Sequence, residues 1–175
     1  MRSDRDLTDT LRRTKAEEEK STGGWLLPVL GRIVFVGGTI ISALDHANPR
    51  PGSCTLTAFE ILGIALFIAG LSLYIFARLT LGRLFSETVR IKPKHVLITK
   101  GLYRIIRHPI YLGEILLYIS IPVIFSSLYG LVIMLTIIPM LLFRIRYEEK
   151  VLSSKFGLEY VEYARKTKKL IPYIY

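Results

Sequence analysis

Four long apolar segments, separated by segments that carry most of the charge, constrain this chain more than any other feature of its sequence. They occupy residues 25–44, 57–79, 109–125 and 128–147. An α-helix needs about 20 apolar residues to cross the hydrocarbon core of a bilayer. Only Ser126 and Ser127 separate the last two segments, which forces an antiparallel helical hairpin. We therefore predict an all-α integral membrane protein with about four transmembrane helices.

The composition agrees with a single membrane domain, residues 25–175, preceded by a polar arm at residues 1–24. Hydrophobic residues make up 51% of the 175-residue chain although its formal net charge is +10, so apolar and charged residues are segregated along the sequence. A basic balance is also found in nucleic-acid-binding proteins, but here no basic face is separate from the apolar segments. We expect anionic lipids, and no nucleic acid, as partners. The single Cys54 cannot form an intrachain disulfide.

The distribution of Lys and Arg predicts the orientation of the chain in the membrane. Residues 1–24 carry six of these side chains, residues 78–107 carry eight and residues 144–169 carry eight. The loop between the first two spans carries only Arg50, and the turn of the hairpin carries none. Cytoplasmic segments of multi-pass proteins are enriched in Lys and Arg. Four spans therefore place both termini, and the basic segments between spans, in the cytoplasm.

The segment Gly101–Glu114 joins a basic segment directly to the third apolar one. Pro109 suits the first turn of a helix, where its missing N–H has no partner to lose. We therefore expect a helix to begin at Pro109, with Arg107 and His108 at its positive N-terminal end. Cations are unfavourable there unless an anion lies among them. The alternative is that both residues are interfacial anchors that contact lipid headgroups.

Two prolines and one glycine predict interruptions in the helices. Pro122 and Pro139 lie inside the third and fourth apolar segments and should kink them. Such kinks either widen a pocket or reflect the general frequency of proline in membrane helices. The fourth helix should continue into water as far as Leu152, and Gly157 should end or bend it. Residues 158–166 then predict a short amphipathic helix at the cytoplasmic interface.

Arg144 and Glu148 lie one helical turn apart where the fourth apolar segment becomes polar. Residues four apart share a helix face, and an exposed ion pair contributes little stability. From spacing alone, a surface ion pair is the favoured interpretation and a functional site the alternative.

An ordered set of motifs extends from Gly101 to Tyr163. Gly101-x-Tyr103-x-x-x-Arg107-His108-Pro109-x-Tyr111-x-Gly113 is followed, after the hairpin, by Glu148-Glu149 and then by Phe156-Gly157-x-x-Tyr160-x-x-Tyr163. The set resembles the isoprenylcysteine carboxyl methyltransferase family, whose wider superfamily includes phospholipid methyltransferases. The resemblance covers residues 81–172, which we regard as the catalytic half.

The resemblance implies S-adenosylmethionine as the cofactor, no metal, and a lipophilic or prenylated methyl acceptor that enters from the bilayer. It implies a catalytic pair, Arg144 on the acceptor side and Glu148. The cofactor contacts that it implies are His95, Leu97, Tyr103, Arg107, His108, Pro109, Tyr111, Glu148 and Glu149. An Arg fork suits a carboxylate acceptor, and a carboxylate needs no general base at neutral pH.

Other functions remain open at this point. A phospholipid amine such as that of phosphatidylethanolamine is the first alternative acceptor. A membrane reductase that binds NADPH is less favoured, because the sequence offers no obvious pocket for the extra phosphate. A non-enzymatic scaffold for anionic lipid would not need Arg107, His108, Glu148 and Glu149 at one interface.

Overall fold

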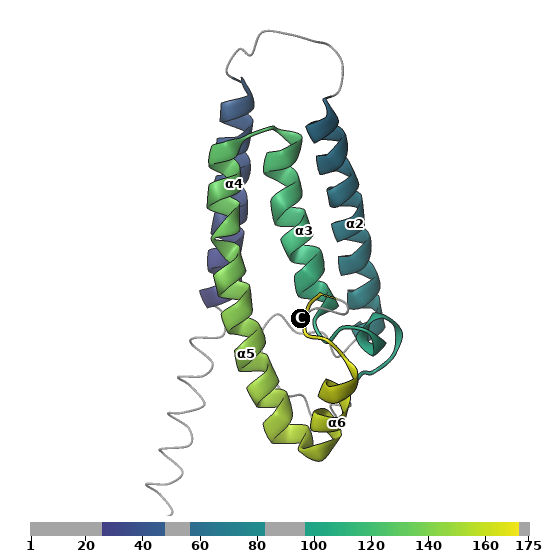
Figure 1. Ribbon diagram of the computed structural model, residues 1–175. Helices are drawn as coiled ribbons and strands as arrows, with labels where there is room; N and C mark the ends of the chain where they lie inside the picture. The colour runs from purple at the N-terminus through teal and green to yellow at the C-terminus, as the bar shows by residue number, and fades with distance from the viewer. Residues whose placement is uncertain (1–25, 48–56, 83–96, 172–175) are drawn as a thin grey trace, which may run out of the picture.

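The computed structural model describes residues 26–47, 57–82 and 97–171, and these residues are mostly helical (Figure 1). The polar arm predicted at residues 1–24 lies outside the described residues, as does His95. The helices are Leu26–Ala47, α2 (Ala58–Leu81), the short 3-10 helix η2 (Gly101–Arg104), α3 (Pro109–Ile124), α4 (Leu128–Leu135), α5 (Ile137–Phe156) and α6 (Leu158–Lys166). α3 packs along α2 on one side and contacts α4 and α5 on the other.

The second span begins with a cap that the sequence analysis did not identify. The Thr57 side chain accepts a hydrogen bond from the Glu60 N–H at 3.3 Å, and the Glu60 carboxylate accepts one from the Thr57 N–H at 2.7 Å. This reciprocal pair is a capping box, which satisfies two N–H groups that the first turn leaves without partners. Glu60 therefore has a structural role at the start of α2.

The prolines act differently in the two helices of the hairpin. α3 begins at Pro109, as predicted, and continues through Pro122 to Ile124. The fourth span is interrupted at Thr136, three residues before Pro139, where the Thr136 N–H bonds to the Ile133 carbonyl at 3.1 Å. Pro139 has no N–H to offer the turn that precedes it, so α4 and α5 are separate helices along one line (Figure 1).

Three helical stretches are long and apolar enough to cross a bilayer. They are Leu26–Ala47, Ala58–Leu81 and Leu128–Phe156, the last made of α4 and α5, whereas α3 has 16 residues. Large apolar side chains are exposed along them, such as Leu79 at 70%, Phe143 at 64% and Phe76 at 62%. Apolar surface of this extent is typical of contact with lipid and not with water. The protein is therefore an integral membrane protein.

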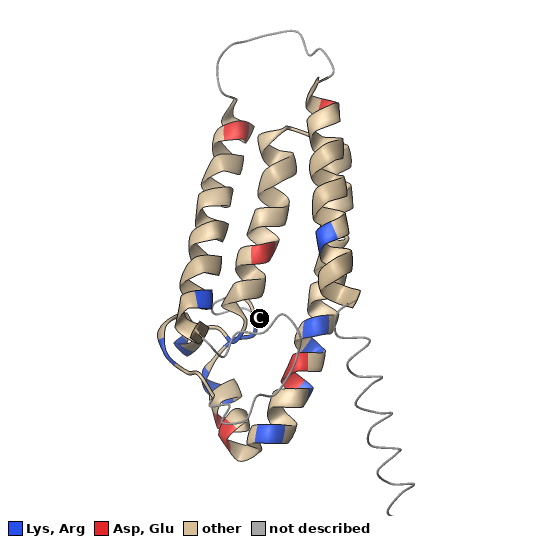
Figure 2. Ribbon diagram, turned by 180° about the vertical axis from the view of Figure 1, so that it is seen from behind, with Lys and Arg blue, Asp and Glu red and all other residues tan. Residues whose placement is uncertain are grey.

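Most of the described charged residues lie at one end of the bundle, the end that holds α6 (Figure 2). The opposite end carries the connection between α3 and α4 and little charge. This asymmetry follows from the alternation of apolar and basic segments, because the described basic segments, residues 97–107 and 144–169, lie at the same end.

Glycines allow α2 and α3 to approach each other closely. A Cβ added at Gly113 would lie 2.9 Å from the carbonyl oxygen of Gly70 and 2.9 Å from the backbone nitrogen of Tyr74. A Cβ at Gly70 would lie 3.0 Å from the Gly113 carbonyl oxygen. Small residues at helix crossings are the usual way in which membrane helices gain packing contacts. Since α3 carries the Arg-His-Pro motif at its start, this contact positions the motif relative to α2.

We expect Gly113→Ala to destabilise the protein by about 1–3 kcal/mol, the usual cost of overpacking, because the new methyl group meets backbone and not a flexible side chain. The measurement is the thermal melting temperature in detergent. Gly37→Ala is the matched control, because no atom lies within 4 Å of its added Cβ. Equal melting temperatures for the two variants would contradict the proposed close contact.

Candidate active site

The last described residues run back along the segment that precedes α3. Gly157, with φ 55°, separates α5 from α6, as predicted, and lets α6 fold back beside α5 (Figure 1). Beyond α6 the backbone pairs with the chain at 105–108. The Arg107 N–H donates to the Lys168 carbonyl at 2.8 Å and the His108 N–H to the Lys169 carbonyl at 3.0 Å, while the Lys168 N–H donates to the Ile105 carbonyl at 3.1 Å. Two segments about 60 residues apart thus form one short ladder.

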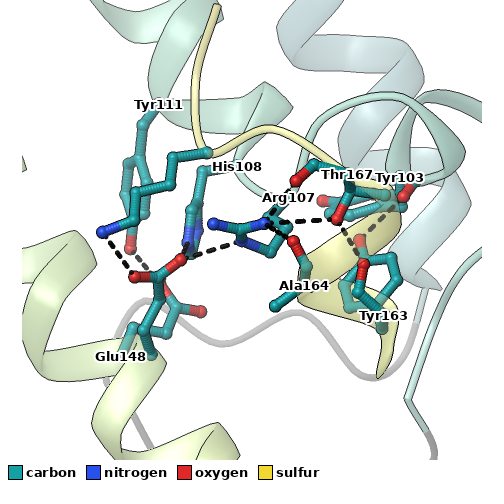
Figure 3. Close-up of polar contacts among 10 residues, drawn as sticks. Tyr103, Arg107, His108, Tyr111, Glu148, Tyr163, Ala164 and Thr167 are labelled. Atoms are coloured by element: carbon teal, nitrogen blue, oxygen red, sulfur yellow. Dashed lines mark hydrogen bonds and ion pairs between the residues drawn. The ribbon is translucent and has the colours of Figure 1, made fainter. Parts of the chain in front are cut away.

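Arg107 connects three elements through one guanidinium. Its Nε donates to Glu149 Oε1 on α5 at 2.9 Å, and its Nη1 donates to the carbonyls of Ala164 and Thr167 at the end of α6 (Figure 3). The carbonyls of a last helical turn have no partners within the helix, and a cation near them is favourable. With a side-chain exposure of 8%, Arg107 lies inside the protein and is not a headgroup anchor.

Glu149 is the anion at the positive end of α3. Besides Arg107, the Lys169 ammonium lies 3.0 Å from its Oε2, and His108 Nε2 lies 3.7 Å from its Oε1. The last separation is too long for a hydrogen bond. The sequence predicted that an anion must accompany Arg107 and His108, and the chain itself supplies one.

Glu148 belongs to a second, more open group. The Tyr111 hydroxyl donates to Glu148 Oε2 at 2.8 Å and accepts from Arg144 Nε at 2.9 Å. The Arg144 guanidinium also lies over the Tyr111 ring, 5.7 Å from its centroid. His108 stacks on the same ring at 5.6 Å (Figure 3). Tyr111 therefore bridges Arg144 and Glu148. Glu148 is 30% exposed, compared with 16% for Glu149.

Two tyrosines of α6 face the site as neutral phenols. Tyr163 donates to the Tyr103 carbonyl at 2.7 Å, and burial raises the pKa of Tyr163 to about 12. Burial, and next the charge of Glu149, raise the pKa of Tyr160 above its ordinary value. Both hydroxyls are therefore proton donors at neutral pH.

Two buried polar atoms lack hydrogen-bond partners among the described residues. They are His108 Nε2 and the Tyr160 hydroxyl, and each side chain belongs to a residue that is only 5% exposed. Burying a polar group without a partner is costly. At each of these atoms a bound molecule can supply a hydrogen bond.

A cavity of about 270 Å³ lies beside this network. Its lining includes Leu97, Thr99, Tyr163, Lys166 and Thr167. Tyr163 and Thr167 also contact the Tyr103–Arg107 segment, so the cavity and the ion network share a wall.

The structure brings most of the predicted site residues together. Arg107, His108, Tyr111, Arg144, Glu148 and Glu149 form one network, and Leu97 lines the adjacent cavity. Pro109 is buried at the start of α3, and the Tyr103 ring is buried with Ala77 and Ile110. Their roles toward a cofactor stay predictions.

The sequence assigned no role to Thr167 or Lys169, and it placed Tyr160 in a family motif without making it a candidate site residue. The motif Tyr160-x-x-Tyr163 was visible, but no local signal pairs residues 167–169 with the Arg-His-Pro segment. That contact depends on the fold of the whole catalytic half.

We expect Arg107→Lys to loosen α6 and the segment after it, because an ammonium cannot reach Glu149 and both helix-end carbonyls at once. Amide hydrogen exchange at residues 164–169 should accelerate at least about tenfold, which corresponds to the loss of one charged hydrogen bond. Arg165→Lys, at an exposed position of α6, is the control. Unchanged protection in Arg107→Lys would contradict the clamp.

Comparisons with known proteins agree with the geometry. The sequence model of the isoprenylcysteine carboxyl methyltransferase (ICMT) family matches residues 62–154. The chain is 37% identical over 117 residues to protein-S-isoprenylcysteine O-methyltransferase of Saccharomyces cerevisiae, covering 65% of this chain and 49% of that protein. It is 31% identical over 115 residues to protein-S-isoprenylcysteine O-methyltransferase B of Arabidopsis thaliana, covering 64% and 58%.

A solved structure is similar over most of the chain. The eukaryotic intramembrane Ras methyltransferase ICMT superimposes with a TM-score of 0.63 at 27% sequence identity, over 88% of this chain and 53% of that one. The chain thus spans about half to three fifths of the length of these proteins.

Proposed function

Since the chain belongs to the isoprenylcysteine carboxyl methyltransferase family, we propose that it transfers a methyl group from S-adenosylmethionine to the carboxylate of an isoprenylcysteine-like acceptor. The observation that carries the proposal is the meeting of Arg144 and Glu148 with Tyr111 and His108 at the charged end of an apolar bundle. An acceptor with a lipid tail and a water-soluble cofactor meet only at such a boundary.

The residues present fit the proposed cofactor. S-adenosylmethionine supplies an electrophilic methyl group on a sulfonium, together with an ammonium, a carboxylate and ribose hydroxyls. Glu148, which is partly exposed and fixed by Tyr111, is suited to accept hydrogen bonds from the ribose hydroxyls. The buried Tyr160 hydroxyl and His108 Nε2 need partners that a polar ligand offers. The Tyr111 ring provides an aromatic face, which tolerates a nearby cation.

Arg144 is the residue that we assign to the acceptor. It lies on α5 beside the apolar part of the bundle, and its guanidinium is oriented by the Tyr111 hydroxyl at 2.9 Å. A guanidinium binds a carboxylate through two parallel hydrogen bonds and stays charged at every relevant pH. An ionised carboxylate is already a nucleophile, so the protein has only to align it and to exclude water.

We further propose that α3 also crosses the membrane, as the third of four spans, and that the site faces the cytoplasm. At 1.5 Å per residue, 16 residues extend about 24 Å, somewhat less than the bilayer core, a mismatch that local thinning accommodates. All strongly basic segments then lie on one side, as the distribution of Lys and Arg favours. The same charges suit anionic lipid headgroups.

The orientation predicts the accessibility of introduced cysteines in a Cys54→Ser background. Ser154→Cys, at the cytoplasmic end of α5, should be protected from a membrane-impermeant maleimide in intact cells. Ser53→Cys, in the loop between the first two spans, should react and serves as the positive control. Labelling of position 154 from outside would reverse the proposed orientation.

The acceptor is tested with labelled methyl groups. We expect base-labile methyl ester on a farnesylcysteine analogue, formed at a rate nearly constant above neutral pH because a carboxylate is fully ionised there. Arg144→Ala should lose at least about tenfold in kcat/KM, since a charged hydrogen-bond partner is removed. The same variant should keep its affinity for S-adenosylhomocysteine.

The alternatives give different results in the same assay. An amine acceptor must lose a proton first, so methylation of phosphatidylethanolamine would accelerate with pH. Label found only in phospholipid, with full activity in Arg144→Ala, would refute the carboxylate acceptor. Binding of NADPH in place of S-adenosylhomocysteine would favour a reductase.

A further inference from the structure

We propose that the ammonium of Lys169 occupies the position at Glu149 that the ammonium of the cofactor takes, so that Lys169 competes with the cofactor and limits its affinity. This inference rests on the proposed function and assigns a role to a residue outside the motifs. The ligand class at this position is a primary ammonium joined to an adenosyl group.

The oxygens of Glu149 are divided between a permanent partner and an exchangeable one. Oε1 faces Arg107 Nε at 2.9 Å, and Arg107 also holds the end of α6. Oε2 faces Lys169 Nζ at 3.0 Å. The Arg107 side chain is 8% exposed and the Lys169 side chain is 31% exposed. Lys169 is therefore the partner that solvent and ligands can reach.

The backbone beneath Lys169 is held, so only its side chain has to move. The Lys169 carbonyl accepts from the His108 N–H at 3.0 Å, and the neighbouring Leu170 is 6% exposed. The flexible four-carbon stem of a lysine allows the ammonium to swing into water while the backbone stays paired. The exchange thus needs no opening of α6 or of the segment after it.

Charge explains why the two ammonium groups exclude each other. Glu149 carries one negative charge and already faces two cations, Arg107 and Lys169. A third cation at the same carboxylate would be repelled by both at close range. Replacing one ammonium by another conserves the charge and the hydrogen bond to Oε2. His108 Nε2, which lies 3.7 Å from Glu149 Oε1 and has no hydrogen-bond partner among the described residues, is then close to the bound ligand.

When a side chain covers a binding position for part of the time, only the uncovered fraction of the protein can bind the ligand. The apparent affinity falls in proportion to that fraction. Removing the covering ammonium should therefore tighten binding. The same competition speeds release of the demethylated product, which keeps its ammonium. Lys169 would thus set affinity and release, without any contact with the transferred methyl group.

The test compares Lys169→Gln with Lys168→Gln, which removes the same charge from the adjacent, exposed position. Titration calorimetry in detergent measures binding of S-adenosylhomocysteine. We expect Lys169→Gln to bind about tenfold tighter than the wild type, the equivalent of one charged hydrogen bond. Lys168→Gln and Lys169→Arg should stay within about twofold, since both keep a cation beside Glu149.

A second ligand isolates the ammonium. 5′-Methylthioadenosine lacks the amino-acid part, so Lys169→Gln should not improve its binding. Melting temperatures of all variants show whether each remains folded, and Lys169→Arg provides a measurement that does not depend on the folding of the glutamine variant.

Each remaining outcome either supports or contradicts the competition between Lys169 and the cofactor. Weaker or unchanged binding of S-adenosylhomocysteine by Lys169→Gln overturns the competition, and so does an equal gain for 5′-methylthioadenosine. Binding that follows the expected pattern, without methylation of the farnesylcysteine analogue, leaves the inference standing and defeats the proposed acceptor. Absence of binding in the wild type and in every variant defeats both.

Discussion

The ion network around Glu149 is the interaction on which the rest of the catalytic half depends. Arg107 from the segment before α3, Glu149 from α5 and Lys169 from the segment after α6 converge there. A buried ion pair contributes little net stability, but removing one partner leaves an uncompensated charge and costs about 3–5 kcal/mol. The network therefore acts chiefly by specifying one arrangement of three segments. It adds side-chain contacts to the backbone hydrogen bonds at residues 105–108 and, through Arg107, contacts the end of α6.

The fold was largely predictable because lipid imposes strong local rules. A bilayer leaves helices as the main option for an isolated apolar segment, so the segments at 25–44 and 57–79 identified their helices to within a few residues. Pro109 and Gly157 predicted a helix start and a helix end from backbone geometry alone. The sequence also predicted that Pro139 would disturb the fourth span, but not that the interruption would fall at Thr136. That position depends on how the freed carbonyls of the preceding turn find partners.

The site was predictable in its members but not in its connections. Spacing alone left Arg144 and Glu148 as a surface ion pair, and only the family motifs made them candidates. In the structure the two are joined through Tyr111 of α3. Spacing in the sequence does not predict this contact. The same holds for Lys169, which reaches Glu149 only because residues 167–169 pair with the Arg-His-Pro segment. Contacts of this kind depend on tertiary structure, whereas the motif records only which residues take part.

α5 explains how one site can serve a lipid-bound acceptor and a soluble cofactor. The helix continues from the apolar bundle into the charged end without interruption, from Ile137 to Phe156. Arg144 and Glu148 are four residues apart on it, a separation of about 6 Å along the axis. A methyl transfer needs its donor and acceptor aligned, with the reacting atoms about 3–3.5 Å apart. The proposed acceptor ligand, Arg144, and the proposed cofactor ligand, Glu148, are therefore one helical turn apart. This separation is of the same order as the distance that the reacting atoms require. In that arrangement the Tyr111 hydroxyl, which bonds to both side chains, fixes the register between the two halves of the reaction.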